Sequence, residues 1–479
     1  MEVPEIKGNT TSLPMWCLSG HHSKEVHYED SIYREQRLSV LLSVIVAFGH
    51  GSHFHGPLFS TLIALGPQWD RSRRWTLEQV IYVSLLMVLD AAPTLKERFD
   101  NARQTTVAMF PGRKRPGKTY QGYVKARRQI SRGAIRVIKR QLCRYHRRIA
   151  GAFWRRHDWL AFSADGTRIE LPRTKANEKA FGCAGRAKSA PQLSVTSLYH
   201  LGTGLPWAWR IGPGTQSEQV QLRRMIGQLP RGSLLVADAG FTRFDLLWAL
   251  SRRHVEVLVR MGSHRTLLTG GVEDAIAKVK GQQVWLWPQK KQKHYPPLTL
   301  RLIRIEQANH SPMCLATSVL DERVLTDRQI GQFYRMRWGQ EVFHRSFKQT
   351  LQQHTMRSGS PGEARRELDW ALMAYLILGL WSVQAQIEAH RDPLTWSVAE
   401  SLRVVRRAMR PGGGLRRRGN LVTRLRRAVK DGYVRTGLKA TRPWPRKKRD
   451  HPPGVPKLRE TTPSEKYRAT KLYETIRRT

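Results

Sequence analysis

The order of strand-like and helical segments after residue 158 constrains the fold more than any other feature of the sequence. Three β-rich runs, separated by glycine and proline, precede an alternation of helical and apolar segments. The segments are, in order, strands over 159–171, 192–202 and 205–211, a helix over 217–229, a strand over 233–237, a helix over 242–253 and a strand over 255–261. Such an order predicts a mixed α/β sheet with flanking helices.

The segment 263–323 is predicted to be a β-rich insertion, because it holds short strand-like runs and four prolines. A long helix is expected from Thr326, a suitable N-cap residue, to about Leu351. A second helix is expected from about Ala364 to His390. These elements predict one mixed-sheet domain over 156–390 that contains the insertion.

Positive charge is concentrated in two segments. The chain of 479 residues has 83 Lys and Arg against 37 Asp and Glu, for a formal net charge of +46. Residues 101–156 hold 17 basic and no acidic residues, and residues 401–479 hold 25 basic and 5 acidic ones. A local surplus of this size is expected where parts of a protein follow a polyanion. A hydrophobic content of 40% excludes wholesale disorder.

The first basic segment lies in a region, 1–155, that is predicted to be helical. Apolar residues recur in its last part at spacings of three or four, as on one face of a helix. Arg128, Arg132 and Arg136 stand between them. With no acidic residue nearby in the sequence, we expect these side chains to contact phosphate groups. A solvated basic face is the alternative.

Other features exclude several classes of protein. Four widely spaced cysteines without a C-x-x-C pair support neither a disulfide framework nor a cysteine zinc site. The start of the chain lacks the pattern of a signal peptide. The most apolar stretch, 370–383, is shorter than the ~20 residues of a membrane span, so we expect a buried helix and no membrane.

Three histidines within 49–56 lack a fourth zinc ligand, so a zinc site is not expected there. The region 391–479, basic and rich in proline, is expected to be partly disordered.

Two aspartates close predicted strands. Asp165 and Asp238 each follow a short buried-looking run, and a glycine comes one or two residues later in both segments. Acidic residues in this position stand where the strand ends of a sheet open into a crevice. Each aspartate alone is also compatible with an ordinary turn.

A third acid stands on the predicted helix after Thr326. It belongs to the pattern Y-x2-R-x3-E-x6-K, formed by Tyr334, Arg337, Glu341 and Lys348. At about 100° per residue all four side chains share a face of about 60°. An isolated ion pair between Arg337 and Glu341 would explain two of these residues but not the other two. The pattern therefore favours a functional surface.

The three carboxylates together predict a site for hard divalent cations. Mg²⁺ and Mn²⁺ prefer a few carboxylate oxygens, with water and phosphate as further ligands. Two such ions about 4 Å apart activate a hydroxyl and stabilise the leaving oxygen of a phosphodiester. Arg337 and Lys348 would then hold neighbouring phosphates, with Tyr334 donating a hydrogen bond. The residues predict metal-dependent cleavage or transfer of a phosphodiester.

The sequence resembles the DDE transposases of bacterial insertion sequences, in particular insertion-sequence family four. The likeness runs from about Tyr120 to about Ile387 and rests on the two aspartate segments, Asp165-Gly166-Thr167 and Asp238-Ala239-Gly240-Phe241, and on the Tyr/Arg/Glu/Lys signature. It implies a ribonuclease H-like catalytic fold with a β-rich insertion before the glutamate. It also implies a dimeric complex that bridges two transposon ends.

The resemblance also implies roles for single residues. It implies metal ligands at Asp165, Asp238 and Glu341, and DNA contacts at Tyr334, Arg337 and Lys348. Some relatives stack a flipped base on a tryptophan of the inserted domain, a role that Trp285 or Trp287 would fill here. A place in the hydrophobic core is the alternative for both tryptophans.

The expected function is that of a DNA transposase. Such an enzyme binds the terminal inverted repeats of an insertion sequence, cuts at the element ends and joins the 3′ ends to target DNA. Two Mg²⁺ ions, for which Mn²⁺ would substitute, would serve each active site. The expected partners are double-stranded DNA and a second copy of the chain, without a small-molecule substrate, in the bacterial cytoplasm at the nucleoid. A catalytically silent DNA-binding protein derived from a transposase and a stand-alone metal-dependent nuclease stay open as alternatives.

Overall fold

The computed structural model describes most of the chain from residue 74 onward. The described residues are 74–109, 115–183, 189–270, 282–288, 294–307, 310–409, 421–432 and 454–478. The histidines of 49–56 lie outside them.

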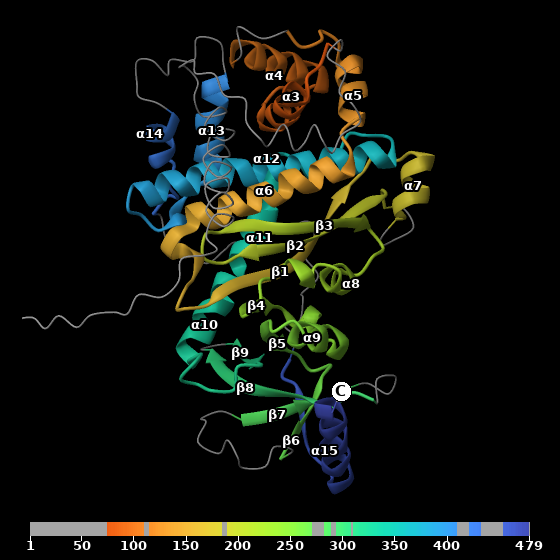
Figure 1. Ribbon diagram of the computed structural model, residues 1–479, viewed down its shortest axis with the longest axis vertical. Helices are drawn as coiled ribbons and strands as arrows, with labels where there is room; N and C mark the ends of the chain where they lie inside the picture. The colour runs from red at the N-terminus through yellow and green to blue at the C-terminus, as the bar shows by residue number, and fades with distance from the viewer. Residues whose placement is uncertain are drawn as a thin grey trace, which may run out of the picture.

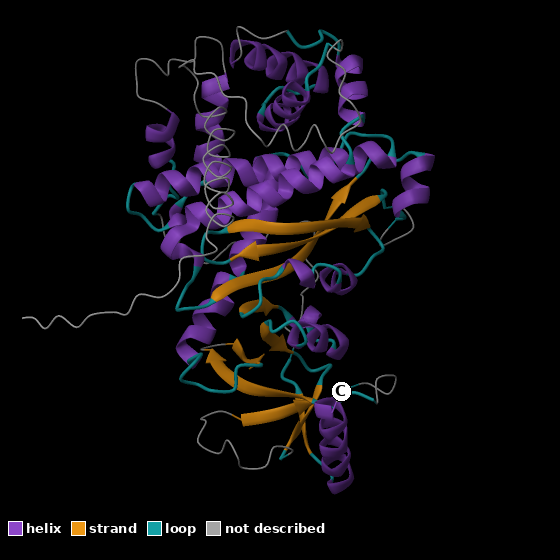
Figure 2. Ribbon diagram, viewed as in Figure 1, coloured by secondary structure: helices purple, strands orange, loops and turns teal. Residues whose placement is uncertain are grey.

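The described strands form one mixed sheet, which confirms the predicted α/β class (Figures 1 and 2). The strands are β1 (Leu160–Glu170), β2 (Gln192–His200), β3 (Leu205–Pro213), β4 (Ser233–Ala237), β5 (Glu256–Met261), β6 (Thr266–Thr269), β7 (Gln282–Leu286), β8 (Leu298–Gln307), β9 (His310–Thr317) and β10 (Lys457–Glu460). Their order is β10-β6-β7-β8-β9-β5-β4-β1-β2-β3. β1 is parallel to β4 and antiparallel to β2, and β4 is parallel to β5.

The described helices cover both faces of the sheet. They are α3 (Leu77–Leu89), α4 (Leu95–Met109), α5 (Tyr120–Arg128), α6 (Arg132–Ala150), α7 (Lys175–Phe181), α8 (Glu218–Arg223), α9 (Phe244–Ser251), α10 (Asp327–Met336), α11 (Trp338–Arg345), α12 (Pro361–Glu388), α13 (Val398–Met409), α14 (Leu421–Arg426) and α15 (Pro463–Arg478). Helices α6, α11 and α12 pack with one face of β1 to β3, whereas α8 and α9 pack on the opposite face.

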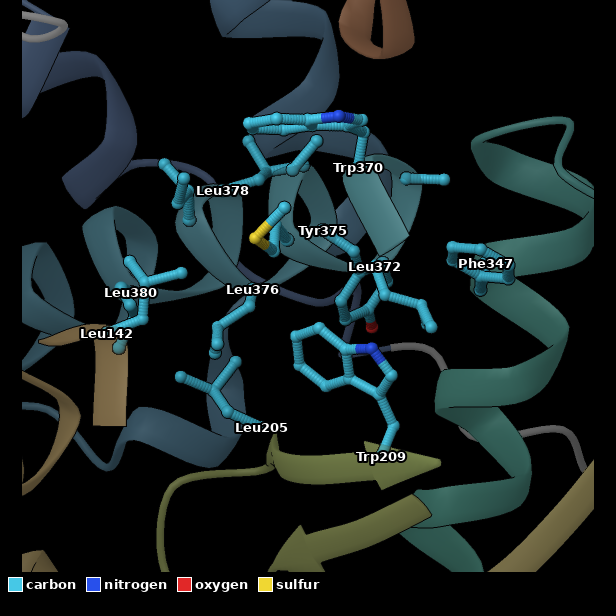
Figure 3. Close-up of a cluster of buried hydrophobic side chains, with 14 of the residues drawn as sticks. Leu142, Leu205, Trp209, Phe347, Trp370, Leu372, Tyr375, Leu376, Leu378 and Leu380 are labelled. Carbon is cyan, nitrogen blue, oxygen red and sulfur yellow. The ribbon is translucent and has the colours of Figure 1, made fainter. Parts of the chain in front are cut away.

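Helix α12 is the centre of the larger core. It contacts α3, α6, α13 and strand β3, so nearly every side of it faces apolar neighbours and its sequence is apolar all round. Figure 3 shows Leu372, Leu376 and Leu380 of α12 beside Leu205 and Trp209 of β3. Its most apolar window would be long enough to cross a membrane but is 89% buried within the protein, as the sequence predicted for 370–383.

The inserted strands do not form a separate sheet. Strand β9 pairs antiparallel with β5, with Cys314 opposite Met261, so β6 to β9 extend the central sheet. A strand at the edge of a sheet has unpaired backbone groups. Strand β9 pairs with β5 and so covers the edge that β5 would otherwise leave open.

The C-terminal region, expected to be a partly disordered tail, contributes folded elements in its described parts. Helices α13 and α14 pack with α12, and β10 pairs in parallel with β6. Helix α15 closes over the insertion, where Ala469 is fully buried with Leu268 and Trp285. The expectation rested on the basic, proline-rich composition of the region. Composition alone does not reveal the few apolar side chains that these elements bury.

Candidate active site

Asp165 and Asp238 lie at the same level on neighbouring parallel strands. Ser163 of β1 is paired with Val236 of β4, and each aspartate follows two residues later. Since side chains alternate along a strand, both aspartates lie on the face that α11 and α12 cover. The Asp165 carboxylate accepts a hydrogen bond from the Gly166 amide within β1 at 2.8 Å, and the Asp238 carboxylate accepts one from the Gly240 amide in the turn after β4 at 2.9 Å. The strand end expected at Asp165 is therefore wrong, because β1 continues to Glu170 through its pairing with β2.

The third carboxylate, that of Glu341, is carried by helices in tandem. Thr326 and Gln329 form a capping box at the start of α10, which confirms Thr326 as the N-cap. The single helix predicted up to Leu351 is divided: α10 ends at Met336, α11 begins at Trp338, and residues Ser346–Thr350 form a π-helical turn. A calculation at about 100° per residue assumes a regular α-helix and does not reveal such a turn, whose i→i+5 hydrogen bonds rotate the residues that follow.

Tyr334, Arg337 and Glu341 form one cluster. Arg337 donates a hydrogen bond to Glu341 Oε1 at 3.0 Å, and its guanidinium lies 5.4 Å from the centre of the Tyr334 ring. Burial alone would lower the pKa of Arg337, but the nearby Tyr334, Glu341 and Asp238 raise it above its ordinary value. Lys348 lies in the π-helical turn, where burial lowers its pKa and the carboxylate of Glu170 opposes that shift. Lys348 therefore stands further along β1 than the cluster.

Gln340 ties the helix of Glu341 to the strand of Asp165. Its side chain is fully buried. Its Nε2 donates to the backbone oxygen of Ser197 at 2.9 Å and to the Ser197 hydroxyl at 3.0 Å, and its Oε1 accepts from Ser163 at 2.6 Å. Because Ser163 and Ser197 lie on β1 and β2, this amide fixes α11 against both strands.

His344 is the second buried polar side chain between α11 and the strands. Its Nε2 lies 3.2 Å from the Ser197 hydroxyl, and its Nδ1 lies 3.7 Å from Asp165 Oδ2. Burial, with a contribution from Lys348, lowers the pKa of His344 to about 3. The imidazole is therefore neutral beside Asp165 at physiological pH.

The carboxylates of the site act on one another. Burial raises the pKa of Asp165 to about 7, and the nearby charges of Glu218 and Asp238 add to the rise. Burial and the charge of Asp238 also raise the pKa of Glu218, the first residue of α8. Like charges gathered in a half-buried place destabilise the ionised forms, a cost that a bound cation relieves.

Two residues of this neighbourhood had no signal in the sequence analysis, Glu218 and Arg260. Val259 of β5 is paired with Ala237, so Arg260 stands at the level of Asp238. Its Nε is buried and has no hydrogen-bond partner within the described residues. Burial raises the pKa of Tyr334, and the guanidinium groups of Arg337 and Arg260 oppose the shift. Arg260 lies in the run 255–261, which is apolar except for Glu256 and Arg260 itself.

The donor atoms suit a hard divalent cation, although they do not close around one here. Within the described residues, no three His, Cys, Asp or Glu side chains gather closely enough to hold a metal ion. Glu341 is engaged by Arg337, whereas Asp165, Asp238 and Glu218 present half-buried carboxylates to one another. Oxygen ligands of this kind are those that Mg²⁺ and Mn²⁺ prefer.

The basic N-terminal helices pair partly with α12. Arg128 shares Glu363 with its neighbour Arg127, at 3.3 Å and 2.6 Å, and stays 57% exposed. Arg132 and Arg136 are exposed on α6. The segment 101–156 contains no acidic residue. Acidic residues of α12 pair with part of its basic side chains, and the other basic side chains face solvent.

The two tryptophans of the insertion lie under α15. Trp285 is 6% exposed and packs against Leu268 and Ala469, so its ring is covered. Trp287 is half-buried, 6.1 Å from Trp285, with the guanidinium of Arg468 6.0 Å from its centre. The core alternative therefore describes Trp285, and only Trp287 keeps partly exposed ring atoms.

Comparisons with known proteins identify relatives of this chain. Residues 160–377 match the family described as the transposase DDE domain. Over 321 residues the chain is 28% identical to the transposase InsG for insertion sequence element IS4 of Escherichia coli (strain K12), an alignment that covers 64% of this chain and 69% of InsG.

Two solved structures also match. The piggyBac transposase synaptic complex with hairpin DNA aligns at a TM-score of 0.40 and 10% identity, covering 85% of this chain and 87% of that one. The pre-cleavage Mos1 transpososome aligns at a TM-score of 0.16 and 12% identity, covering 47% of this chain and 77% of that one.

Proposed function

Because the chain is a DDE transposase of the insertion-sequence-4 type, with its transposase DDE domain over residues 160–377, we propose that it excises and inserts a mobile element by phosphodiester chemistry. It binds the terminal inverted repeats, cuts the DNA at the element ends and joins the freed 3′ ends to target DNA. The observation that carries this proposal is the meeting of Asp165 and Asp238, at equal levels on parallel strands, with the helix of Glu341.

The catalytic residues in this proposal are Asp165, Asp238 and Glu341, which hold Mg²⁺ or Mn²⁺, two ions per site. When bound, the ions lower the pKa of the attacking water or 3′-hydroxyl and stabilise the leaving oxygen. The strand order β5-β4-β1-β2-β3, with β1 parallel to β4 and antiparallel to β2, supports a ribonuclease H-like arrangement of this domain over 156–390.

Arginine and lysine side chains around the carboxylates bind the phosphates of the DNA backbone. Arg337 and Arg260 flank Tyr334 and have buried Nε atoms without a hydrogen-bond partner in the described residues, which suits these guanidinium groups to donate hydrogen bonds to phosphate oxygens. Lys348 serves a neighbouring phosphate further along β1. Exposed Arg132 and Arg136 of the helical region 1–155 bind the element ends.

The complex that acts on DNA is a homodimer that bridges two element ends, in the bacterial cytoplasm at the nucleoid. Trp287 offers a partly exposed ring for an unstacked base. The basic region 391–479 adds contacts to double-stranded DNA through its own cations.

The proposal is tested with the purified full-length protein, Mg²⁺ and DNA that carries the inverted repeats flanking its gene. Wild type and the surface control Glu306→Gln are expected to cut at the ends and join them to a target plasmid. Glu341→Ala is expected to bind the same DNA without cutting it, because a ligand of the cation is missing. Unchanged cleavage by Glu341→Ala would refute the site. Cleavage without joining would instead indicate a nuclease, and binding without cleavage by wild type a silent DNA-binding protein.

A further inference from the structure

A fourth carboxylate reaches the site from the opposite face of the sheet. Strand β4 ends at Ala237 and its last pair with β1 is Ser163 opposite Val236, whereas β1 continues to Glu170. In the described residues no strand therefore lies beside the second half of β1 on that side. A side chain from the α8 face can approach this part of β1, and the carboxyl of Glu218, the first residue of α8, packs over Gly166, the residue after Asp165.

The backbone of β1 makes room for Glu218. A Cβ atom added to Gly166 would lie 2.3 Å from Glu218 Cδ and 2.4 Å from its Oε1, so the carboxyl occupies the space above the glycine that follows Asp165. The Glu218 carboxylate accepts no hydrogen bond and forms no ion pair within the described residues, although the charge of Arg168 acts on it from further away. A half-buried carboxylate without a donor is costly unless a cation completes it.

Two glutamines of the same short helix fix its position. Gln221 is fully buried, accepts from the Thr196 amide of β2 at 3.0 Å and donates to Ser194 Oγ at 3.0 Å. Gln219 donates to the backbone oxygen of Gly240 in the turn that follows Asp238. Helix α8 is thus tied both to the strand beside β1 and to the turn that follows the second aspartate, and its first residue is held over Gly166.

We propose that Glu218 is a further ligand of the divalent cation that Asp165 and Asp238 hold, and that Gly166 is glycine because this ligand passes over it. The inference rests on the proposed function and adds a fourth oxygen donor, from α8, to the three acids of the DDE set. A purely structural role is the competing explanation, since an acid in the first turn of a helix stabilises that helix through its dipole.

The test measures Mn²⁺ binding to the full-length protein by titration calorimetry, in the absence of DNA. Glu218→Gln is expected to weaken Mn²⁺ binding at least about tenfold. Gly166→Ala keeps the carboxylate but displaces its flexible end, and is expected to weaken binding in the same direction. Asp165→Asn is the positive control, and Glu306→Gln, whose side chain is exposed on β8, is the matched negative control. Urea unfolding of each variant confirms that it is folded.

The outcomes separate this inference from the proposed function. Wild-type Mn²⁺ affinity in Glu218→Gln, with a loss in Asp165→Asn, would overturn the role of Glu218 and leave the proposed function standing. Wild-type affinity in both variants would overturn the metal site itself and with it both proposals. If Glu218→Gln does not fold, Gly166→Ala decides, since unchanged affinity in that variant would overturn the inference and weakened affinity would support it.

Discussion

Replacing Gln340 by alanine tests whether a buried amide holds α11, the helix of Glu341, to the sheet. Gln340 makes hydrogen bonds of 2.6 Å to Ser163 and 2.9 Å to the Ser197 backbone oxygen, and its side chain is fully buried. Each neutral hydrogen bond contributes about 1 kcal/mol net. The lost packing of the side chain adds about 1 kcal/mol. We therefore expect Gln340→Ala to lower the free energy of unfolding by about 3 kcal/mol.

The assay is urea unfolding followed by circular dichroism, with DNA-end cleavage measured at a temperature where the variant stays folded. Gln332→Ala on α10 is the matched control, because its Oε1 has no hydrogen-bond partner within the described residues, and its loss is expected to stay below about 1 kcal/mol. Cleavage by Gln340→Ala should fall more than by Gln332→Ala, since Glu341 follows Gln340 on α11. Equal and small losses for the two variants would refute the reasoning.

Three further predictions concern other parts of the molecule. Burial lowers the pKa of His200 to about 4 from an unfolded value of about 6.5, so its contribution to stability is present above about pH 6.5 and is lost as the pH falls toward 4, by up to about 3 kcal/mol. Thermal unfolding against pH should show this fall in wild type and a weaker one in His200→Gln, and identical pH profiles would contradict it. Ala469→Arg should free α15 from the insertion, because Ala469 is fully buried against Trp285, and limited proteolysis should then cut 454–478 faster than in the control Thr470→Arg. Arg132→Ala and Arg136→Ala should each lower the slope of log affinity against log salt for DNA by about 0.9, whereas Arg323→Ala, in an exposed ion pair with Asp321, should leave the slope unchanged.

The end of β4 and the helix cap were predictable because their signals are local. Asp238 follows a short apolar run, and Thr326 stands three residues before Gln329, so neighbours in the sequence determine both structures. The strand end expected at Asp165 was wrong, because β1 continues to Glu170 through its pairing with β2. The mixed α/β class needed only the succession of elements from residue 159 to 261, whereas the order of the strands within the sheet comes from the structure.

The remaining features depend on contacts between distant segments. Glu363 and Asp369 of α12 neutralise arginines and a lysine more than 200 residues earlier, so a count of acids within 101–156 overestimates the free basic face. The carboxyl of Glu218 packs over Gly166 beside the part of β1 that extends beyond its pairing with β4, and this depends on strand pairing and not on spacing in the sequence. The π-helical turn that displaces Lys348 also escapes a calculation that assumes a regular helix.

The parallel pairing of β10 with β6 has a consequence for the order in which the protein is made. Thr461 bonds to Thr269, a residue 192 positions earlier, so β6 leaves the ribosome long before its partner strand exists. Synthesis at about 5–20 residues per second leaves that edge open for roughly ten seconds or more. During this interval β1 and β4, the strands of Asp165 and Asp238, can already fold. The open edge of β6 meanwhile offers its unpaired backbone to other nascent chains. Premature termination before residue 457 would make that exposure permanent, so aggregation is the expected fate of such fragments.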